Sequence, residues 1–94
     1  MITAVGYLKK ARQERRTILQ QYGLEKVFRK LSKKFRREFG DNTEIFIYYD
    51  TCPELSMDMF TAEVMSPMPD GLLFTVGNPD IQEVISRLEE YLNE

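Results

Sequence analysis

Histidine and tryptophan are absent from this 94-residue sequence, and cysteine occurs once, as Cys52. Without histidine the chain lacks the commonest general base at neutral pH, and with it any Ser-His or Cys-His catalytic pair. One thiol forms neither a disulfide within the chain nor a zinc site, and the neighbouring acids Asp50 and Glu54 disfavour a reactive thiolate. We therefore expect a protein that is not an enzyme and that uses no metal and no cofactor.

Long apolar runs are missing as well. No stretch approaches the ~18 consecutive apolar residues of a membrane span. Lys9 and Lys10 follow the mildly apolar N-terminal residues, whereas the positive residues of a signal peptide come first. The sequence contains no glycine-rich phosphate loop, no HExxH and no CxxC pair, and its acidic residues lack the spacing of a calcium loop. We expect a cytoplasmic protein without membrane contact.

The sequence does contain a very uneven distribution of charge. Its net charge is only −2, from 13 basic and 15 acidic residues. Twelve basic and three acidic residues precede Gly40, which gives that part a charge of +9; the remainder has one basic residue, Arg87, and twelve acidic ones, a charge of −11. Such asymmetry is typical of contact with a polyanion, or of an acidic surface directed at a basic partner. It also suits two faces that pair with each other, within the fold or between two copies.

Two segments carry the 3.6-residue apolar spacing of amphipathic helices. Residues 24–39 form one of them, and Gly40 stands directly after it, where a left-handed helix cap favours glycine. The other has its apolar stripe between residues 81 and 92. Its expected N-cap is Asn78, with Pro79 at the first helical position.

The residues before Gly23 are less regular. Residues 7–22 are predicted to form a further helix that is partly exposed, because residues 12–16 are polar on every side. Gly23 separates this helix from the next. For residues 2–5 a short strand is the alternative to helix.

Three strands are expected between the helices, at residues 44–50, 57–65 and 72–76, with a turn at 66–71 between the last two. Both faces of the first strand are apolar, so a further layer should cover the second face of the sheet. The N-terminal helix and another copy of the chain are the two candidates.

These elements predict one α+β domain over residues 1–94, in two layers and α-β-β-β-α order: an N-terminal helix or helix pair, a three-stranded antiparallel sheet and a C-terminal helix. Residues 1–39 form its basic helical part, and residues 40–94 form its acidic β-β-β-α part.

Two surfaces are candidates for binding. The first is a basic ridge around the apolar stripe of the 24–39 helix, long enough to track the phosphates of a polyanion. It consists of Lys26, Arg29, Lys30, Lys33, Lys34 and Arg37. Cations near the end of this helix also complement its dipole, so part of this charge has a purely structural explanation.

The second surface joins acidic residues to methionines that cluster around one hairpin. Acidic groups that mimic a polyanion capture nucleic-acid-binding proteins, and methionine provides an adaptable apolar contact. This protein-partner candidate consists of Glu54, Met57, Asp58, Met59, Glu63 and Met65. The alternative role of these methionines is to fill the gap beneath the N-terminal helix.

The sequence thus indicates a non-catalytic binding or regulatory module that acts through its charged surfaces on a nucleic acid or on a nucleic-acid-binding protein, in the latter case as a small inhibitor. The partner, protein or nucleic acid, is left open. The alternative is a homo-oligomeric protein-interaction domain, such as a homodimer, with no nucleic-acid role.

Overall fold

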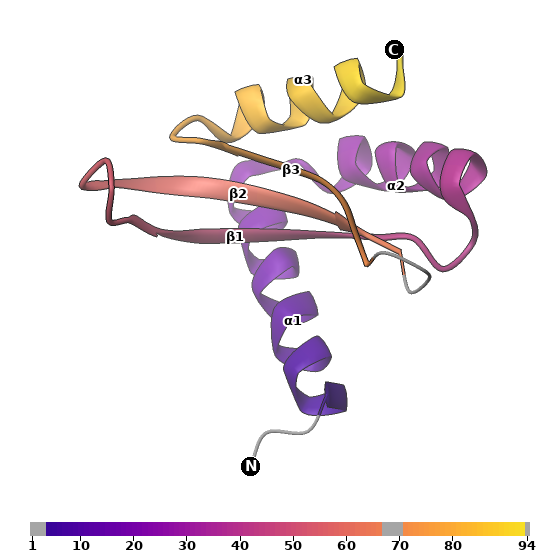
Figure 1. Cartoon of the computed structure of the whole chain (residues 1–94), viewed down its shortest axis with the longest axis horizontal. Helices are drawn as coiled ribbons and strands as arrows, with labels where there is room; N and C mark the ends of the chain where they lie inside the picture. The colour runs from indigo at the N-terminus through magenta and orange to yellow at the C-terminus, as the bar shows by residue number, and fades with distance from the viewer. Residues whose placement is uncertain (1–3, 67–70, 94) are drawn as a thin grey trace.

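Along the described part of the chain, two helices come first, three strands follow and one helix comes last (Figure 1). The structure is a computed structural model that describes residues 4–66 and 71–93. Its elements are α1 (Ala4–Tyr22), α2 (Glu25–Phe39), β1 (Glu44–Cys52), β2 (Met57–Met65), β3 (Leu72–Asn78) and α3 (Ile81–Leu92). The predicted α+β class, with a helix pair at the N-terminal end, is confirmed. Within these residues no helix is both long and apolar enough to cross a membrane.

The three strands form one antiparallel sheet in the order β1-β2-β3. Ile47 of β1 is paired with Ala62 of β2, and Ala62 is paired with Val76 of β3. Because side chains alternate along a strand, these three residues share one face of the sheet. Two strands continue further than predicted: β1 to Cys52 and β3 to Asn78.

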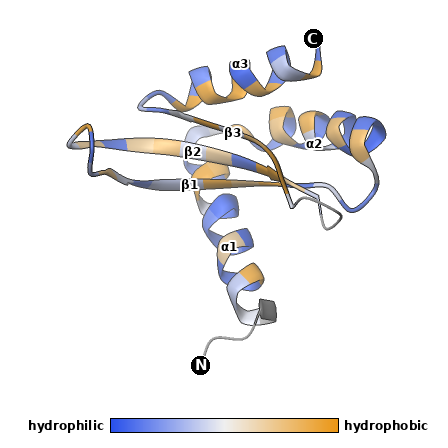
Figure 2. Cartoon of the chain, in the orientation of Figure 1, coloured by the Kyte–Doolittle hydropathy of each residue, from blue (hydrophilic) through white to orange (hydrophobic). Residues whose placement is uncertain are grey.

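The main core lies between this face of the sheet and the helices α2 and α3. Phe35 of α2, Ile47 of β1 and Leu88 of α3 are completely buried in it. Figure 2 shows the hydrophobic side of α3 turned toward the sheet, as the apolar stripe of this helix predicts. The two striped helices therefore lie on the same face.

The helix α1 crosses from the other, open face of the sheet to the core face, past the edge strand β1. Its C-terminal half contributes Ile18 and Leu19 to the core, while Tyr7 and Leu8 lie over the open face. Figure 1 shows the N-terminal half of the helix extending beyond the sheet. The helix covers the β1 side of the open face, where Phe46 is only 5% exposed.

The starts of two helices differ from the sequence-based expectations. The helix α1 already contains Ala4 and Val5, so these two residues are not in a strand; residues 2 and 3 lie outside the described part of the chain. The predicted turn 66–71 is described only at its ends, where the Ser66 N–H donates to the Gly71 carbonyl at 2.6 Å.

The second difference is the start of α3. Its N-cap is Asp80, whose carboxylate accepts a hydrogen bond from the Gln82 N–H at 3.0 Å, and not Asn78. Asn78 is the last residue of β3, paired with Phe60, and its side chain accepts from the Asp80 N–H. The strand thus holds Asn78 two residues before the N-cap, and Pro79 precedes the helix instead of opening it.

The end of α2 requires glycine, as predicted, although not in the expected cap geometry. Gly40 has φ +114° and ψ 156°, and its N–H donates to the Arg36 carbonyl. The ψ value is far from the left-handed helical region, but a positive φ of this size is strained for any residue with a Cβ. Gly40 thereby turns the chain from α2 toward β1.

Candidate nucleic-acid interface

A groove of about 390 Å³ runs between α1 and α2 and is lined mainly by basic side chains. We call it the α1–α2 groove. Its basic residues are Arg12, Arg15, Arg16, Arg29, Lys33 and Arg36. Glu25 is its one acidic lining residue, and Phe28 and Leu19 form part of its apolar floor. Two helices therefore direct their cations into one concavity, where a polyanion meets more positive potential than on a single helix.

Helix geometry explains the contribution of α2. Arg29, Lys33 and Arg36 are spaced i, i+4 and i+7, so they lie on one side of the helix. The buried residues Phe28 and Phe35 set the orientation of the helix on the sheet. With the helix fixed in this way, the basic stripe is turned toward α1.

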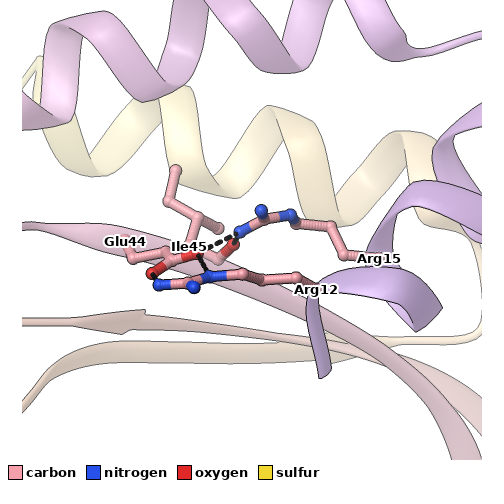
Figure 3. Close-up of polar contacts among 4 residues, drawn as sticks. All are labelled: Arg12, Arg15, Glu44 and Ile45. Atoms are coloured by element: carbon pink, nitrogen blue, oxygen red, sulfur yellow. Dashed lines mark hydrogen bonds and ion pairs between the residues drawn. The ribbon is translucent and has the colours of Figure 1, made fainter. Parts of the chain in front are cut away.

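The contribution of α1 depends on a carboxylate from the sheet. Arg12 makes a two-pronged contact with Glu44, through Nε to Oε2 at 2.7 Å and through Nη2 to Oε1 at 2.8 Å. Nη1 of Arg15 donates to Oε2 of Glu44 at 3.0 Å and to the Ile45 carbonyl at 2.8 Å. Figure 3 shows both arginines directed from α1 toward the start of β1. These contacts fasten α1 along the edge of the sheet.

Arg15 is also held by two aromatic rings. Its guanidinium carbon lies 5.5 Å from the ring centroid of Phe28 and 5.6 Å from that of Phe46, distances suited to cation–π attraction. Its side chain is 19% exposed, whereas that of Arg12 is 50% exposed. Arg15 is therefore mainly a structural residue, while Arg12 still presents part of its guanidinium to the groove.

The ion pairs also change the proton affinity of the groups involved. The hydrogen bond from Arg12 holds the pKa of the Glu44 carboxyl below its ordinary value, with further help from Arg15 and against the opposing effect of burial. The same hydrogen bond raises the pKa of Arg12. Glu44 is thus a carboxylate at neutral pH, and it cancels part of the charge of the two arginines.

The structure divides the predicted basic ridge of α2 between two sides of the helix. Arg29 and Lys33 line the α1–α2 groove. Lys34 and Arg37 lie on the other side, in a shallow pocket with Leu92 and Asn93 of the α3 end. Lys26 and Lys30 are exposed and line neither of these concavities.

The six residues of the protein-partner candidate are also distributed over more than one surface. Glu63 and Met65 line a groove of about 700 Å³ on the open face of the sheet, beneath the first turns of α1. The carboxylate of Asp58 instead accepts a hydrogen bond from the Thr51 hydroxyl at 2.6 Å, on the opposite side of the hairpin.

The remaining members of that set, Glu54, Met57 and Met59, lie at or near the turn between β1 and β2. Met57 is 41% exposed, Met59 is half-buried with Gly77 beside it, and Glu54 accepts from the Cys52 thiol at 3.3 Å. Met65 lines the groove beneath α1, whereas Met57 and Met59 do not. Pairing between two copies of the chain stays a prediction.

Four residues of the groove were not among the sequence candidates: Arg12, Arg15, Arg16 and Arg36. A sequence signal existed for Arg36, because it continues the stripe of Arg29 and Lys33 by helical spacing. No comparable signal places the arginines of α1 opposite that stripe. Their position depends on Glu44, which is 32 residues from Arg12 along the chain.

Among residues 4–66 and 71–93, no group of three or more acidic or cysteine side chains is arranged to hold a metal ion. The sequence and the fold were also compared with known proteins. No family model, no curated protein and no solved structure matches this chain.

Proposed function

We propose that this protein is a non-catalytic module that binds a nucleic acid through the α1–α2 groove. The observation that carries the proposal is the convergence of six basic side chains from two helices on one concavity with a single acidic lining residue. Phosphate contact requires positive charge within reach of the backbone, and it provides affinity with little sequence preference.

The acidic half of the chain lies partly away from the groove and partly beside it, where Asp41 and Glu44 share a pocket with Arg12, Arg15 and Arg36. The outer side of α3 presents Glu89 and Glu90 to solvent, on a helix that does not contribute to the groove. Charges more than a Debye length apart, about 8–10 Å at physiological salt, are largely screened from each other. Beside the groove, the Glu44 carboxylate is held by Arg12 and Arg15, so the cations without an ion pair in the described residues, Arg16, Arg29, Lys33 and Arg36, are the ones that would attract a phosphate most.

The test compares single charge removals inside and outside the groove. Arg16→Gln and Arg29→Gln each remove one cation from the groove, whereas Arg37→Gln removes the same charge on the α3 side of α2. All three side chains are exposed, so the fold should persist. We expect each groove variant to weaken binding of a labelled oligonucleotide by up to about eightfold at ~0.1 M salt, and Arg37→Gln to weaken it less.

Fluorescence anisotropy with labelled DNA and RNA measures these affinities, and circular dichroism checks the fold of each variant. Absence of binding by the unmodified protein at low salt would overturn the proposal. An equal loss for Arg37→Gln and the groove variants would also overturn it, because the affinity would then come from diffuse charge and not from the groove.

A further inference from the structure

The strand β3 forms one edge of the sheet, and no strand of the described chain pairs with its outer side. The opposite edge strand, β1, is crossed by α1, whose Arg15 donates to the Ile45 carbonyl (Figure 1). An uncovered edge presents unpaired backbone N–H and C=O groups, which can pair with another strand. The outer side of β3 is therefore the part of the sheet that can receive a partner.

The hydrogen bond from Arg15 establishes which residues of β3 point outward. It reaches the Ile45 carbonyl from α1, so this carbonyl points away from β2. In an antiparallel sheet, the N–H and C=O of one residue point to the same side, and two paired residues point either toward each other or both away. Ile45 is paired with Val64, and Val64 is paired with Phe74. Phe74 therefore points toward β2, and the next residue, Thr75, points outward.

Two further observations agree with this assignment. The Thr75 hydroxyl donates to the Ala62 carbonyl at 3.2 Å, so the Ala62 backbone points toward β3, as the alternation requires. Its partner Val76 consequently points toward β2, and Gly77 points outward. Both Thr75 and Gly77 are exposed, and because glycine has no side chain, the exposed atoms of Gly77 belong to its backbone. The outward backbone groups of the strand are thus accessible.

The composition of β3 leaves this edge unprotected. Edge strands that stay unpaired usually contain charged residues or proline, which discourage pairing with another chain. Residues 72–78 read LLFTVGN and contain neither. The register shift opposite β2, a further protective feature, is confined to the Leu72 end of the strand.

The core is also incompletely covered at this edge. Among the described residues, the partly buried apolar side chains that pack against the core all belong to β3 and α3: Leu73, Phe74, Val76, Tyr91 and Leu92. At the β1 edge, by contrast, α1 contributes the buried residues Ile18 and Leu19. One more apolar layer beside β3 would complete the core.

We propose that β3 pairs antiparallel with β3 of a second copy of this chain, which joins two three-stranded sheets into one six-stranded sheet. With all seven residues of β3 overlapping, Thr75 lies opposite the Thr75 of the second copy, and Phe74 lies opposite the second copy's Val76. The two outward-pointing Thr75 residues then exchange their N–H and C=O groups, and apolar side chains meet on the core face.

The charge of the edge favours a second copy as the occupant. An uncharged strand has no attraction for an acidic or a basic foreign segment, whereas an identical strand meets it without like-charge repulsion. The second copy also brings the same incompletely covered apolar side chains, so one contact completes both cores. The proposal does not depend on nucleic-acid binding.

The first test removes the central pair of hydrogen bonds. Thr75→Pro eliminates an N–H that points outward, so the hydrogen bonds between β2 and β3 should persist. The pairing of two copies loses both central N–H donors, and the dissociation constant of the dimer should rise roughly ten- to a hundredfold. Thr75→Val is the control, since it removes only the hydroxyl that bonds to Ala62 and should leave dimerisation unchanged. Sedimentation velocity measures the association, and circular dichroism checks each fold.

The second test uses charge at the same position. Thr75→Lys and Thr75→Glu each place two like charges opposite each other, so each variant alone should dimerise more weakly than the unmodified protein. An equal mixture of the two variants should recover association, because opposite charges then meet across the axis. Leu55→Lys adds the same charge at a 61% exposed position in the turn between β1 and β2, and it should have no effect. This test decides the matter if Thr75→Pro does not fold.

Three results would overturn the proposal. The first is an unmodified protein that stays monomeric at every concentration. The second is a dimer that the proline and charge variants leave intact, or a mixture that associates no better than either variant alone. The third is a dimer that dissociates between ~0.1 M and ~0.5 M salt, since screening weakens pairing between the basic and acidic halves but not between uncharged strands.

Discussion

Glu44 shows at the scale of single residues how a partly buried charge organises this protein. It is the first residue of β1, and it receives hydrogen bonds from two arginines of α1 that are one helical turn apart. Arg15 also donates a hydrogen bond to the Ile45 carbonyl, and its guanidinium lies over two aromatic rings. Lysine lacks the planar donor array of this site, so even Arg15→Lys is not a conservative change here.

We predict that Glu44→Gln lowers the free energy of unfolding by about 1–3 kcal/mol at neutral pH, since hydrogen bonds to a charged group are lost or weakened. Arg12 holds the pKa of Glu44 below its ordinary value in the folded protein. The stabilisation is therefore fully present above the unfolded-state pKa of about 4.3, and it disappears as pH falls through the folded-state pKa. Urea unfolding between pH 7 and pH 3 measures the difference.

Glu83→Gln is the control for this prediction. Glu83 pairs with Arg87 at 3.3 Å on the exposed side of α3, with both side chains about half exposed. Pairs of this kind contribute only about 0.3–0.5 kcal/mol. If the two variants lose equal stability, or if the effect of Glu44→Gln persists unchanged at pH 3, the described role of Glu44 is incorrect.

At the scale of elements, the helices α2 and α3 were predicted well because their signals are local. Phe28, Leu31 and Phe35 have the helical spacing, and the structure buries all three. The start of α3 was predicted incorrectly because Asn78 and Asp80 are both good N-cap residues two positions apart. Pairing of Asn78 with Phe60 in the sheet, which no local signal shows, decided between them.

The N-cap assignment makes a direct prediction. Asp80→Ala should lower the free energy of unfolding by about 1 kcal/mol, because the Gln82 N–H loses its acceptor at the helix start. Gln82→Ala, at the exposed neighbouring position, should change it by less than about 0.5 kcal/mol. Chemical denaturation compares the two variants, and a loss for Gln82→Ala as large as that for Asp80→Ala would contradict the assignment.

On the scale of the whole molecule, the fold places only some of the basic residues that precede Gly40 around the α1–α2 groove and leaves the others on different surfaces. Lys34 and Arg37 belong to the same basic segment as Arg29 and Lys33, yet they lie on the other side of α2. Arg12 and Arg15 are partly neutralised by Glu44. Four groove cations, Arg16, Arg29, Lys33 and Arg36, have no ion pair in the part of the chain that the structure describes.

These four cations set the expected salt dependence of binding. If each neutralises one phosphate of duplex DNA, log K should fall against log salt with a slope of about −3 to −4. Arg16→Gln should make the slope shallower by about one. A titration between ~50 mM and ~200 mM salt measures it, and a slope near zero would show that phosphate contacts do not provide the affinity.

The sequence by itself determined the helices, the strands and the separation of charge along the chain. These depend on local periodicity, on turn residues and on composition, as the apolar stripes of α2 and α3 show. Only the tertiary structure decided which cations face one another. That depends on the path of α1 past the edge of β1 and on Glu44, a single carboxylate far from Arg12 in sequence. Contacts between such distant residues form only when the whole core places both of them, so no local pattern indicates them.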